Sequence, residues 1–277
     1  MADIFCSSAK EENQVKDVVS DMDLQSFTTS TEGEKTIARL LGKSEEGLKS
    51  EFYLFKVKEL MKRVGLRVQS ALSQKDLEQK ISASKKVGVE EIFLTPFYHS
   101  VVRLLKPSDL KGIKICIAVD YPLGEQSLRQ KVIGVKEGCK NQADYIFCSV
   151  AQGSVKLSCF GEEKRKILKS RRACKKPFGI IINALTELDD VQKILKNTEG
   201  LRLDSIVIDG TDASENQTIQ ALTTANTFKG KRKLHVLSSV QTAFELSALV
   251  DAGADKVYTP FAFNVGQELI AKAQITI

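Results

Sequence analysis

The chain has 277 residues, 42% of them hydrophobic and 27% charged, and its formal net charge is +6 at pH 7. This length and apolar content can bury a large core, and they fit one α/β barrel domain, commonly about 250 residues, with an extension. No stretch approaches the roughly 18 apolar residues of a membrane helix, and the first residues lack the basic start and apolar run of a secretory signal. We therefore expect a soluble, cytoplasmic protein.

The cysteines and histidines limit the chemistry that we expect. None of the six cysteines forms a C-x-x-C pair, and Cys116 and Cys148 fall inside apolar runs where thiols usually behave as small core residues. This pattern is typical of a reducing, intracellular compartment. With His99 and His235 as the only histidines, a metal site built on several histidines is not expected, and we expect no cofactor.

Residues 1–64 differ in composition from the rest of the chain. The stretch 26–35 is rich in Ser, Thr, Gly and Glu and predicts a loop, whereas Leu48, Phe52, Phe55 and Val64 predict a helix that covers one end of the following domain. We interpret residues 1–64 as a partly helical N-terminal extension and residues 65–277 as one domain.

From residue 65 onward, apolar or β-branched runs alternate with helical patterns at intervals of about 25 to 35 residues, which is typical of successive βα units. The predicted strands are 65–72, 91–97, 114–121, 143–150, 178–185, 205–209, 234–240 and 255–259. Eight parallel strands can close a barrel, so the predicted fold is a (β/α)8 TIM barrel. Between the fifth and sixth strands, Thr186 and Asp189 predict a capping box that opens a helix, with Leu188, Val191, Ile194 and Leu195 on its buried face.

A family resemblance rests on several short segments in the same order. The segment 119–124 contains Tyr121-Pro122-Leu123-Gly124, which resembles the aromatic-Pro-Leu-Gly turn after the third strand of the deoxyribose-phosphate aldolase family. Further similar segments follow at 136–138, 143–144, 180–186, 203–207 and 242–254. The resemblance covers roughly residues 65–262 and implies an aldolase-type barrel, with self-association as a further family property.

The same resemblance implies that the reactive groups of the family are missing. Val207 aligns with the lysine that forms the Schiff base, His235 (or Val236) with the second lysine, and Phe147 with the acidic residue of the fourth strand. An aliphatic side chain can neither attack a carbonyl nor accept a proton. No lysine occupies the later half of any predicted strand, since Lys114 and Lys256 both lie at strand beginnings.

Two other groups of residues are candidate sites. Ser238 and Ser239 follow the seventh predicted strand, where the family binds a sugar phosphate, although Pro260 in the next turn removes an amide donor. Asp120 and Asp209 end the third and sixth predicted strands and, together with His235, form a candidate rebuilt site for acid–base chemistry. Helix capping or ordinary loop solvation is the alternative interpretation of these carboxylates.

Two basic segments dominate the net charge. The residues considered for an acidic partner are Lys164, Arg165, Lys166, Arg171, Arg172, Lys231 and Arg232. A filament, an anionic lipid surface or nucleic acid would suit such segments. The alternative is the solvated outer face of the fourth barrel helix, with Ile167 and Leu168 turned inward.

The sequence thus leads to three functional hypotheses. The first is a pseudoenzyme related to deoxyribose-phosphate aldolase, which has lost aldolase activity and acts as a binding, scaffold or regulatory protein. The second is an active carbon–carbon lyase, acting on deoxyribose 5-phosphate or a related sugar phosphate with a rebuilt site. The second hypothesis predicts a polar, open barrel mouth. The third is a protein that binds a sugar phosphate without transforming it.

Overall fold

The computed structural model describes residues 57, 59–68, 72–96, 102, 105, 107–156 and 159–275. The chain divides into two compact units, one formed by Lys62–Gly266 and the other by Met1–Met61 with Gln267–Ile277. The first unit carries the barrel and ends within the last helix, whereas the sequence assigned all of 65–277 to one domain. Most of the predicted extension lies outside the described residues, so its role stays a prediction. Val64, predicted to belong to the helix of that extension, is instead the first residue of a barrel strand.

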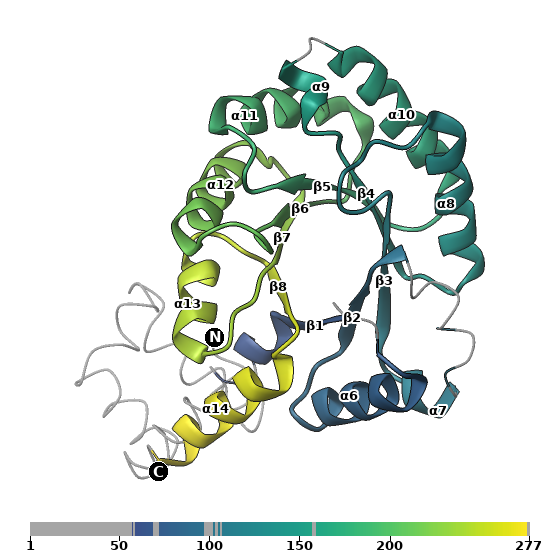
Figure 1. Ribbon diagram of the computed structural model, residues 1–277. Helices are drawn as coiled ribbons and strands as arrows, with labels where there is room; N and C mark the ends of the chain where they lie inside the picture. The colour runs from purple at the N-terminus through teal and green to yellow at the C-terminus, as the bar shows by residue number, and fades with distance from the viewer. Residues whose placement is uncertain are drawn as a thin grey trace, which may run out of the picture. The chain divides into compact units, whose positions relative to one another are not determined.

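Eight parallel strands form one closed barrel in sequence order, and β1 pairs with β8 to close it (Figure 1). The strands are β1 (Val64–Val68), β2 (Glu91–Leu94), β3 (Lys114–Val119), β4 (Tyr145–Ser149), β5 (Phe178–Asn183), β6 (Ser205–Asp209), β7 (Lys233–Leu237) and β8 (Lys256–Thr259). The predicted TIM barrel and all eight strands are therefore confirmed. The third strand ends two residues earlier than predicted, because Asp120 has a φ of 58°, outside the strand region.

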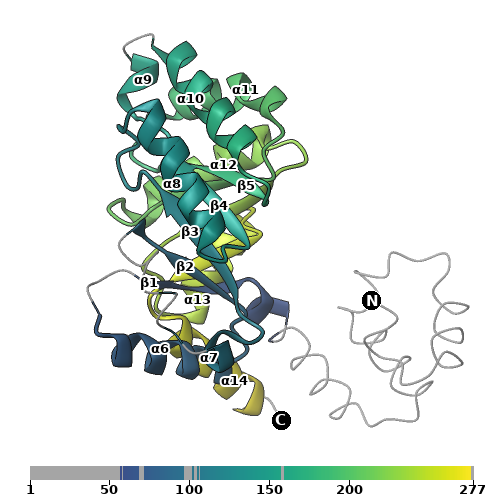
Figure 2. The same cartoon turned by 90° about the vertical axis from the view of Figure 1, so that its right-hand side faces the viewer.

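Helices α8 to α13 cover the outside of the strands (Figures 1 and 2). The helices are α6 (Gln74–Lys86), α7 (Pro107–Leu110), α8 (Leu128–Lys140), α9 (Gly153–Lys156), α10 (Phe160–Ala173), α11 (Leu188–Asn197), α12 (Glu215–Phe228), α13 (Ala243–Asp251) and α14 (Ala262–Ile275), with a 3-10 turn, η3, at Glu199–Leu201. Within the described part of the chain, no helix combines the length and apolar composition needed to cross a bilayer.

The start of α11 corrects one prediction. Glu187 precedes this helix and makes no side-chain capping hydrogen bond, so the capping box predicted at Thr186 and Asp189 is wrong. Val191 and Ile194 are buried as predicted, but Leu188 is 41% exposed because it occupies the first helical position rather than the inner face.

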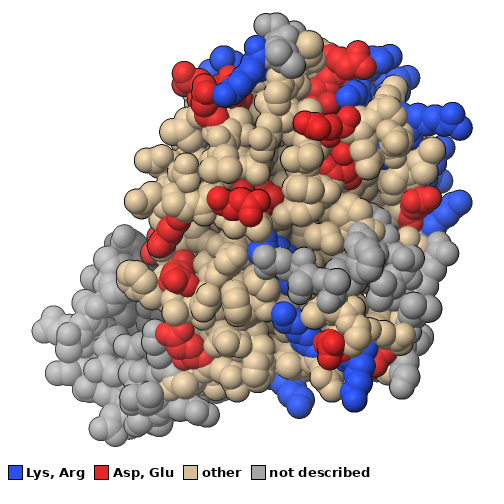
Figure 3. Space-filling view, in the orientation of Figure 1, with Lys and Arg blue, Asp and Glu red and all other residues tan. Residues whose placement is uncertain are grey.

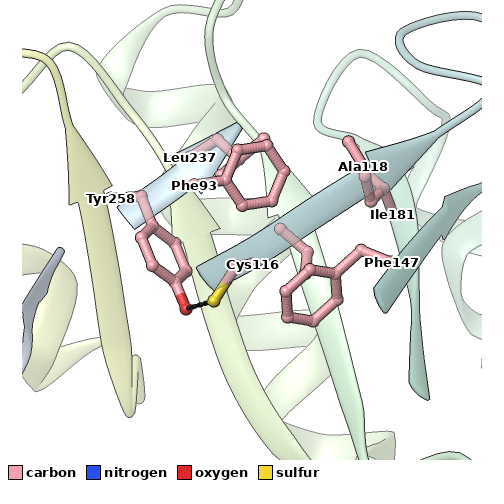
Figure 4. Packing of buried hydrophobic residues seen from close by; sticks show 8 residues of the cluster. Phe93, Cys116, Ala118, Phe147, Ile181, Leu237 and Tyr258 are labelled. Carbon is pink, nitrogen blue, oxygen red and sulfur yellow. Dashed lines mark hydrogen bonds between the residues drawn. The ribbon is translucent and has the colours of Figure 1, made fainter. Parts of the chain in front are cut away.

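The centre of the barrel is filled by apolar and aromatic side chains (Figure 4). They are Phe93, Cys116, Ala118, Phe147, Ile181, Val207, Leu237 and Tyr258. The Tyr258 ring lies against Gly65, where an added Cβ would be 2.2 Å from the ring atom Cδ1, so this strand position requires glycine. Cys116 and Cys148 are buried free thiols, as predicted. The barrel is therefore a packed core with polar groups only towards its two ends.

Candidate functional site

Polar side chains from four segments meet at the carboxyl ends of the strands. This mouth cluster consists of Arg67 on β1, Tyr121 after β3, Asp209 at the end of β6, Thr211 after β6 and Ser239 after β7. Arg67 is 2% exposed; it donates hydrogen bonds to the Thr211 hydroxyl and, at 3.4 Å, to the Ser239 hydroxyl. The Thr211 hydroxyl donates in turn to Asp209 Oδ1 at 2.5 Å. A buried cation is thereby linked to a buried carboxylate through one hydroxyl.

The electrostatics of the mouth cluster follow from its burial. Burial lowers the pKa of Arg67, and its interactions with Tyr121, Asp209 and Asp212 oppose that shift. Burial raises the pKa of Tyr121 to about 12, and the Asp209 charge adds to the shift. At neutral pH the cluster therefore holds a guanidinium, a carboxylate and a neutral phenol. It can orient or stabilise an anionic group, but it contains no amine nucleophile.

Asp120 lies outside the mouth, behind the barrel wall. Its Oδ2 is 3.2 Å from the ammonium of Lys131 on α8, which also contacts Glu163 Oε1 at 2.6 Å and donates to the Ser149 carbonyl at 2.8 Å. Burial raises the pKa of Asp120, and Lys131 and the backbone amide of Gln126 oppose the shift. Asp120 therefore fixes the β3–α8 loop from behind and is unavailable for chemistry in the mouth.

His235 lies towards the opposite, amino end of the barrel. Its ring centroid is 5.6 Å from that of Phe147 and 5.8 Å from that of Tyr258, and burial lowers its pKa to about 4. In the β6–β7 register Val207 pairs with His235 and Asp209 with Leu237, so His235 lies two residues below the level of Asp209. Asp120, Asp209 and His235, the candidate rebuilt site, are not brought together.

The positions of the buried lysines bear on imine chemistry. Two lysines are buried among the described residues, Lys131 and Lys256. Lys131 is ion-paired between helices, as given above. Lys256 Nζ donates to the Lys62 carbonyl at 2.6 Å and lies 3.3 Å from Glu91 Oε1, at the amino end of β8. Val207 has no exposed surface and belongs to the central core. Neither buried amine lies in the mouth.

Ser238 and Ser239 border a rim pocket of about 170 Å³ beside the mouth. The pocket also contains Thr211 and the carboxylates of Glu215 and Glu245. Glu245 Oε2 accepts hydrogen bonds from the backbone amides of Gln241 at 2.7 Å and Thr242 at 3.1 Å. A carboxylate thus occupies amide donors at the start of α13 that an incoming anion would use, which weakens the case for phosphate here.

The basic segments divide between surface and interior. In Figure 3 basic side chains gather at the edge where α10 lies, and Lys164, Arg165 and Arg172 are exposed there. Arg165 pairs with Glu162 at 3.2 Å. Arg232, predicted as part of a basic surface, is only 8% exposed and donates to the carbonyls that end α11 and α12. It therefore stabilises helix ends and is not available to a partner.

Sequence reasoning missed Arg67, Tyr121 and Thr211 as members of the mouth cluster. The available signal was a single charged residue inside the apolar strand Val64–Val68. Long charged side chains are rarely buried without partners, so such a residue indicates a polar interior site.

Comparisons with known proteins relate this barrel to one group of enzymes. No family model matches the chain. A deoxyribose-phosphate aldolase of Dictyoglomus turgidum is 26% identical over 204 residues, which cover 70% of this chain and 89% of that protein. One of Mycoplasma pneumoniae is 25% identical over 163 residues, covering 57% and 71%. These similarities support the resemblance of the chain to the deoxyribose-phosphate aldolase family.

Solved structures agree at the level of the fold. The deoxyribose phosphate aldolase of Aeropyrum pernix has a TM-score of 0.66 at 16% identity and covers 81% of this chain and 96% of that one. The aldolase QR15 has a TM-score of 0.67 at 16% identity, with coverage of 78% and 98%. At such identities the likeness concerns the barrel. What the mouth does must be argued from its own residues.

Proposed function

We propose that this chain is a non-catalytic relative of the deoxyribose-phosphate aldolases, which has lost imine chemistry and acts by binding. The observation that carries the proposal is the mouth cluster, in which a buried arginine is bonded through Thr211 to Asp209. A guanidinium stays protonated and does not add to carbonyl groups. The resemblance aligns the Schiff-base lysine with Val207, and a hydrocarbon side chain cannot replace that amine.

The two buried lysines support the same proposal. An imine-forming lysine must lose its proton, so its pKa is lowered by burial or by a neighbouring cation. Lys131 has the opposite environment: although burial lowers its pKa, Cys148 and the carboxylates of Glu163 and Asp120 leave it raised. Lys256 lies at a strand beginning, 3.3 Å from Glu91 Oε1 and bonded to the Lys62 carbonyl, away from the mouth.

The decisive experiment treats the purified full chain with deoxyribose 5-phosphate and sodium borohydride, followed by intact-mass measurement. We expect neither cleavage of the sugar phosphate nor a covalent adduct. A deoxyribose-phosphate aldolase treated in parallel shows that the trapping works. Turnover accompanied by a lysine adduct would overturn the proposal.

An active lyase without imine chemistry is the second candidate. It is favoured by the convergence of Arg67, Tyr121 and Asp209 on one mouth, since a fixed guanidinium stabilises oxyanion charge that develops during carbon–carbon cleavage. Its distinguishing result is cleavage without any borohydride-trapped adduct, together with loss of that cleavage in Arg67→Met. Absence of cleavage in the wild-type chain removes this candidate.

Binding of a sugar phosphate at the rim pocket remains a further proposal, supported only by Ser238 and Ser239. A ligand present at about 100 times its dissociation constant stabilises the folded state by roughly 2.7 kcal/mol, which a thermal-shift assay detects. No shift with deoxyribose 5-phosphate at millimolar concentration would exclude it. Contact of exposed α10 lysines and arginines with an acidic partner, and self-association, are likewise proposals.

A further inference from the structure

The amino end of the barrel contains a second pocket, of about 260 Å³. It is lined by Lys62, Arg63, Glu91, Tyr145, Lys233, His235, Asp255 and Lys256. Four of these residues are the first residues of β2, β4, β7 and β8, and Lys62 and Arg63 immediately precede β1. The pocket is therefore separated from the mouth cluster by the apolar centre of the barrel, and it belongs to no site described above.

Part of the pocket lining is already engaged. Lys256 pairs with Glu91 at 3.3 Å, and Glu91 Oε2 accepts a hydrogen bond from the Tyr258 hydroxyl at 2.9 Å. Arg63 donates to the Ala254 carbonyl at 3.2 Å. The Asp255 carboxylate accepts from the Leu234 amide at 2.8 Å and lies 3.5 Å from Lys229 Nζ. Both carboxylates of the pocket are thus neutralised by groups of the protein.

Three other groups remain available to a ligand. The Tyr145 hydroxyl and the Lys233 ammonium make no hydrogen bond or ion pair with any described residue. His235 Nδ1 is buried and has no hydrogen-bond partner among the described residues. An unmade hydrogen bond at a buried polar atom costs about 1–3 kcal/mol, so such an atom calls for a physical explanation. The rings of Tyr145 and His235 both lie against the Phe147 ring, at centroid distances of 6.5 and 5.6 Å, so the two residues are close together in the barrel.

The charge of the pocket selects the kind of ligand. Four basic residues and two acidic ones line it, and His235 is neutral because burial lowers its pKa to about 4. The excess of two positive charges favours an anion. The volume suits a small molecule with some bound water rather than a nucleotide or a polymer.

We propose that this amino-end pocket binds a small oxyanion, a carboxylate or a phosphate, through Lys233 and Tyr145, with His235 at its base. Lys233 supplies the charge and the Tyr145 hydroxyl supplies a directed hydrogen bond. The inference does not depend on the proposed loss of aldolase chemistry, because the pocket and the mouth share no residue.

Isothermal titration of the full chain with inorganic phosphate, and separately with malonate, at constant ionic strength tests the proposal. We expect saturable binding of at least one probe, and which one binds decides between phosphate and carboxylate. Lys233→Gln and Tyr145→Phe should each weaken binding about tenfold, the loss of one charge-assisted hydrogen bond. Lys231→Gln, an exposed lysine two residues away that does not line the pocket, is the matched control and should bind as the wild type does.

Three results would overturn the proposal. The first is no saturation by either anion in the millimolar range. The second is binding that Lys233→Gln and Tyr145→Phe leave unchanged. The third is binding that Ser239→Ala abolishes while both pocket variants retain it, because the anion would then occupy the rim of the mouth. Circular dichroism of each variant verifies that the barrel is folded.

Discussion

At the carboxyl end of the barrel, polar side chains are bonded to one another, whereas at the amino end several polar side chains of the pocket are available to a ligand. In the mouth, Arg67 donates to Thr211 and Thr211 donates to Asp209. The amino-end pocket leaves Tyr145 and Lys233 without a bonding partner among the described residues. In barrels of this type the carboxyl end usually carries function and the amino end stability. In this protein, by contrast, the polar side chains available to a ligand lie at the amino end.

This comparison shows that a polar mouth is not by itself a reactive one. A charged group contributes to chemistry when its hydrogen-bonding capacity is directed at a substrate, and Arg67 directs it at protein hydroxyls. Substitutions at the two ends can separate a stabilising role of the mouth cluster from a response of the amino end to its charged surroundings.

Arg67→Met should lower the free energy of unfolding by about 3–4 kcal/mol. The substitution removes the cation that interacts electrostatically with Asp209, which is 3% exposed. Removing one member of a buried ionic network is strongly destabilising, because the remaining charge loses its partner. Urea denaturation followed by circular dichroism at pH 7 measures the change. Arg165→Met is the control, because the pair of Arg165 with Glu162 has 57% side-chain exposure on both sides and should contribute less than about 1 kcal/mol. Equal effects of the two substitutions would mean that the mouth cluster does not stabilise the fold.

Acidification should destabilise the barrel through His235. Burial lowers its pKa to about 4 from the usual 6.5; among its charged neighbours, Glu91 and Asp255 raise it and Lys256 and Lys233 lower it. Between these two values the unfolded chain binds more protons than the folded one, so stability falls as pH decreases from 6.5 to 4. At 1.36 kcal/mol per pKa unit the loss attributable to His235 is about 3 kcal/mol.

Urea denaturation of the wild type and of His235→Gln at several pH values isolates this contribution. Carboxylates elsewhere also titrate in this range, but they do so in both proteins. The pH dependence of the variant should therefore be shallower between pH 6.5 and 4. Parallel profiles would show that His235 is already protonated in the folded state or that its cavity admits water.

Gly65→Ala should cost about 2 kcal/mol by disturbing the core that separates the two ends. The new Cβ would lie 2.2 Å from the Tyr258 ring, which has no exposed surface and cannot move away freely. Gly161→Ala on α10 is the matched control, because no atom lies within 4 Å of its Cβ position and alanine favours helix. Thermal unfolding should separate the two variants, with Gly161→Ala as stable as the wild type or slightly more so. A neutral Gly65→Ala would mean that Tyr258 has an alternative position.

The sequence predicts the barrel well because the periodicity of burial depends on the fold as a whole. The strand β5 (Phe178–Asn183) is apolar up to its last residue, as expected of a strand covered on both faces, and it begins at the predicted first residue. The errors concern local conformation. The capping box predicted at Thr186 depends on the dihedral angles of a few residues, which composition does not determine.

The candidate site is harder to predict because one residue can reverse the direction of a side chain. Ala118 faces the barrel interior, so strand alternation predicts that Asp120 does the same. The positive φ of Asp120 interrupts the alternation, and Tyr121 enters the mouth while Asp120 reaches Lys131 behind the wall. His235 does face inward, but it lies two residues before the level of Asp209, so it belongs to the amino end of the barrel. Asp209 alone of the three candidate residues is in the mouth.

Glu91→Gln is the smallest change that tests the amino end. Its carboxylate is the largest of the influences that raise the pKa of His235, and it also pairs with Lys256. Glutamine still accepts the Tyr258 hydrogen bond, so the expected loss of stability at pH 7 is only about 1 kcal/mol. Without the negative charge, the pKa of His235 in the folded state should decrease further, and the acid-induced loss of stability should extend to lower pH.

Glu90→Gln, the exposed neighbour outside the pocket, is the control and should retain the wild-type profile in urea denaturation across the same pH range. Identical profiles for Glu91→Gln and Glu90→Gln would show that the amino-end charges do not act on His235, and the comparison between the two ends would then rest on hydrogen bonding alone.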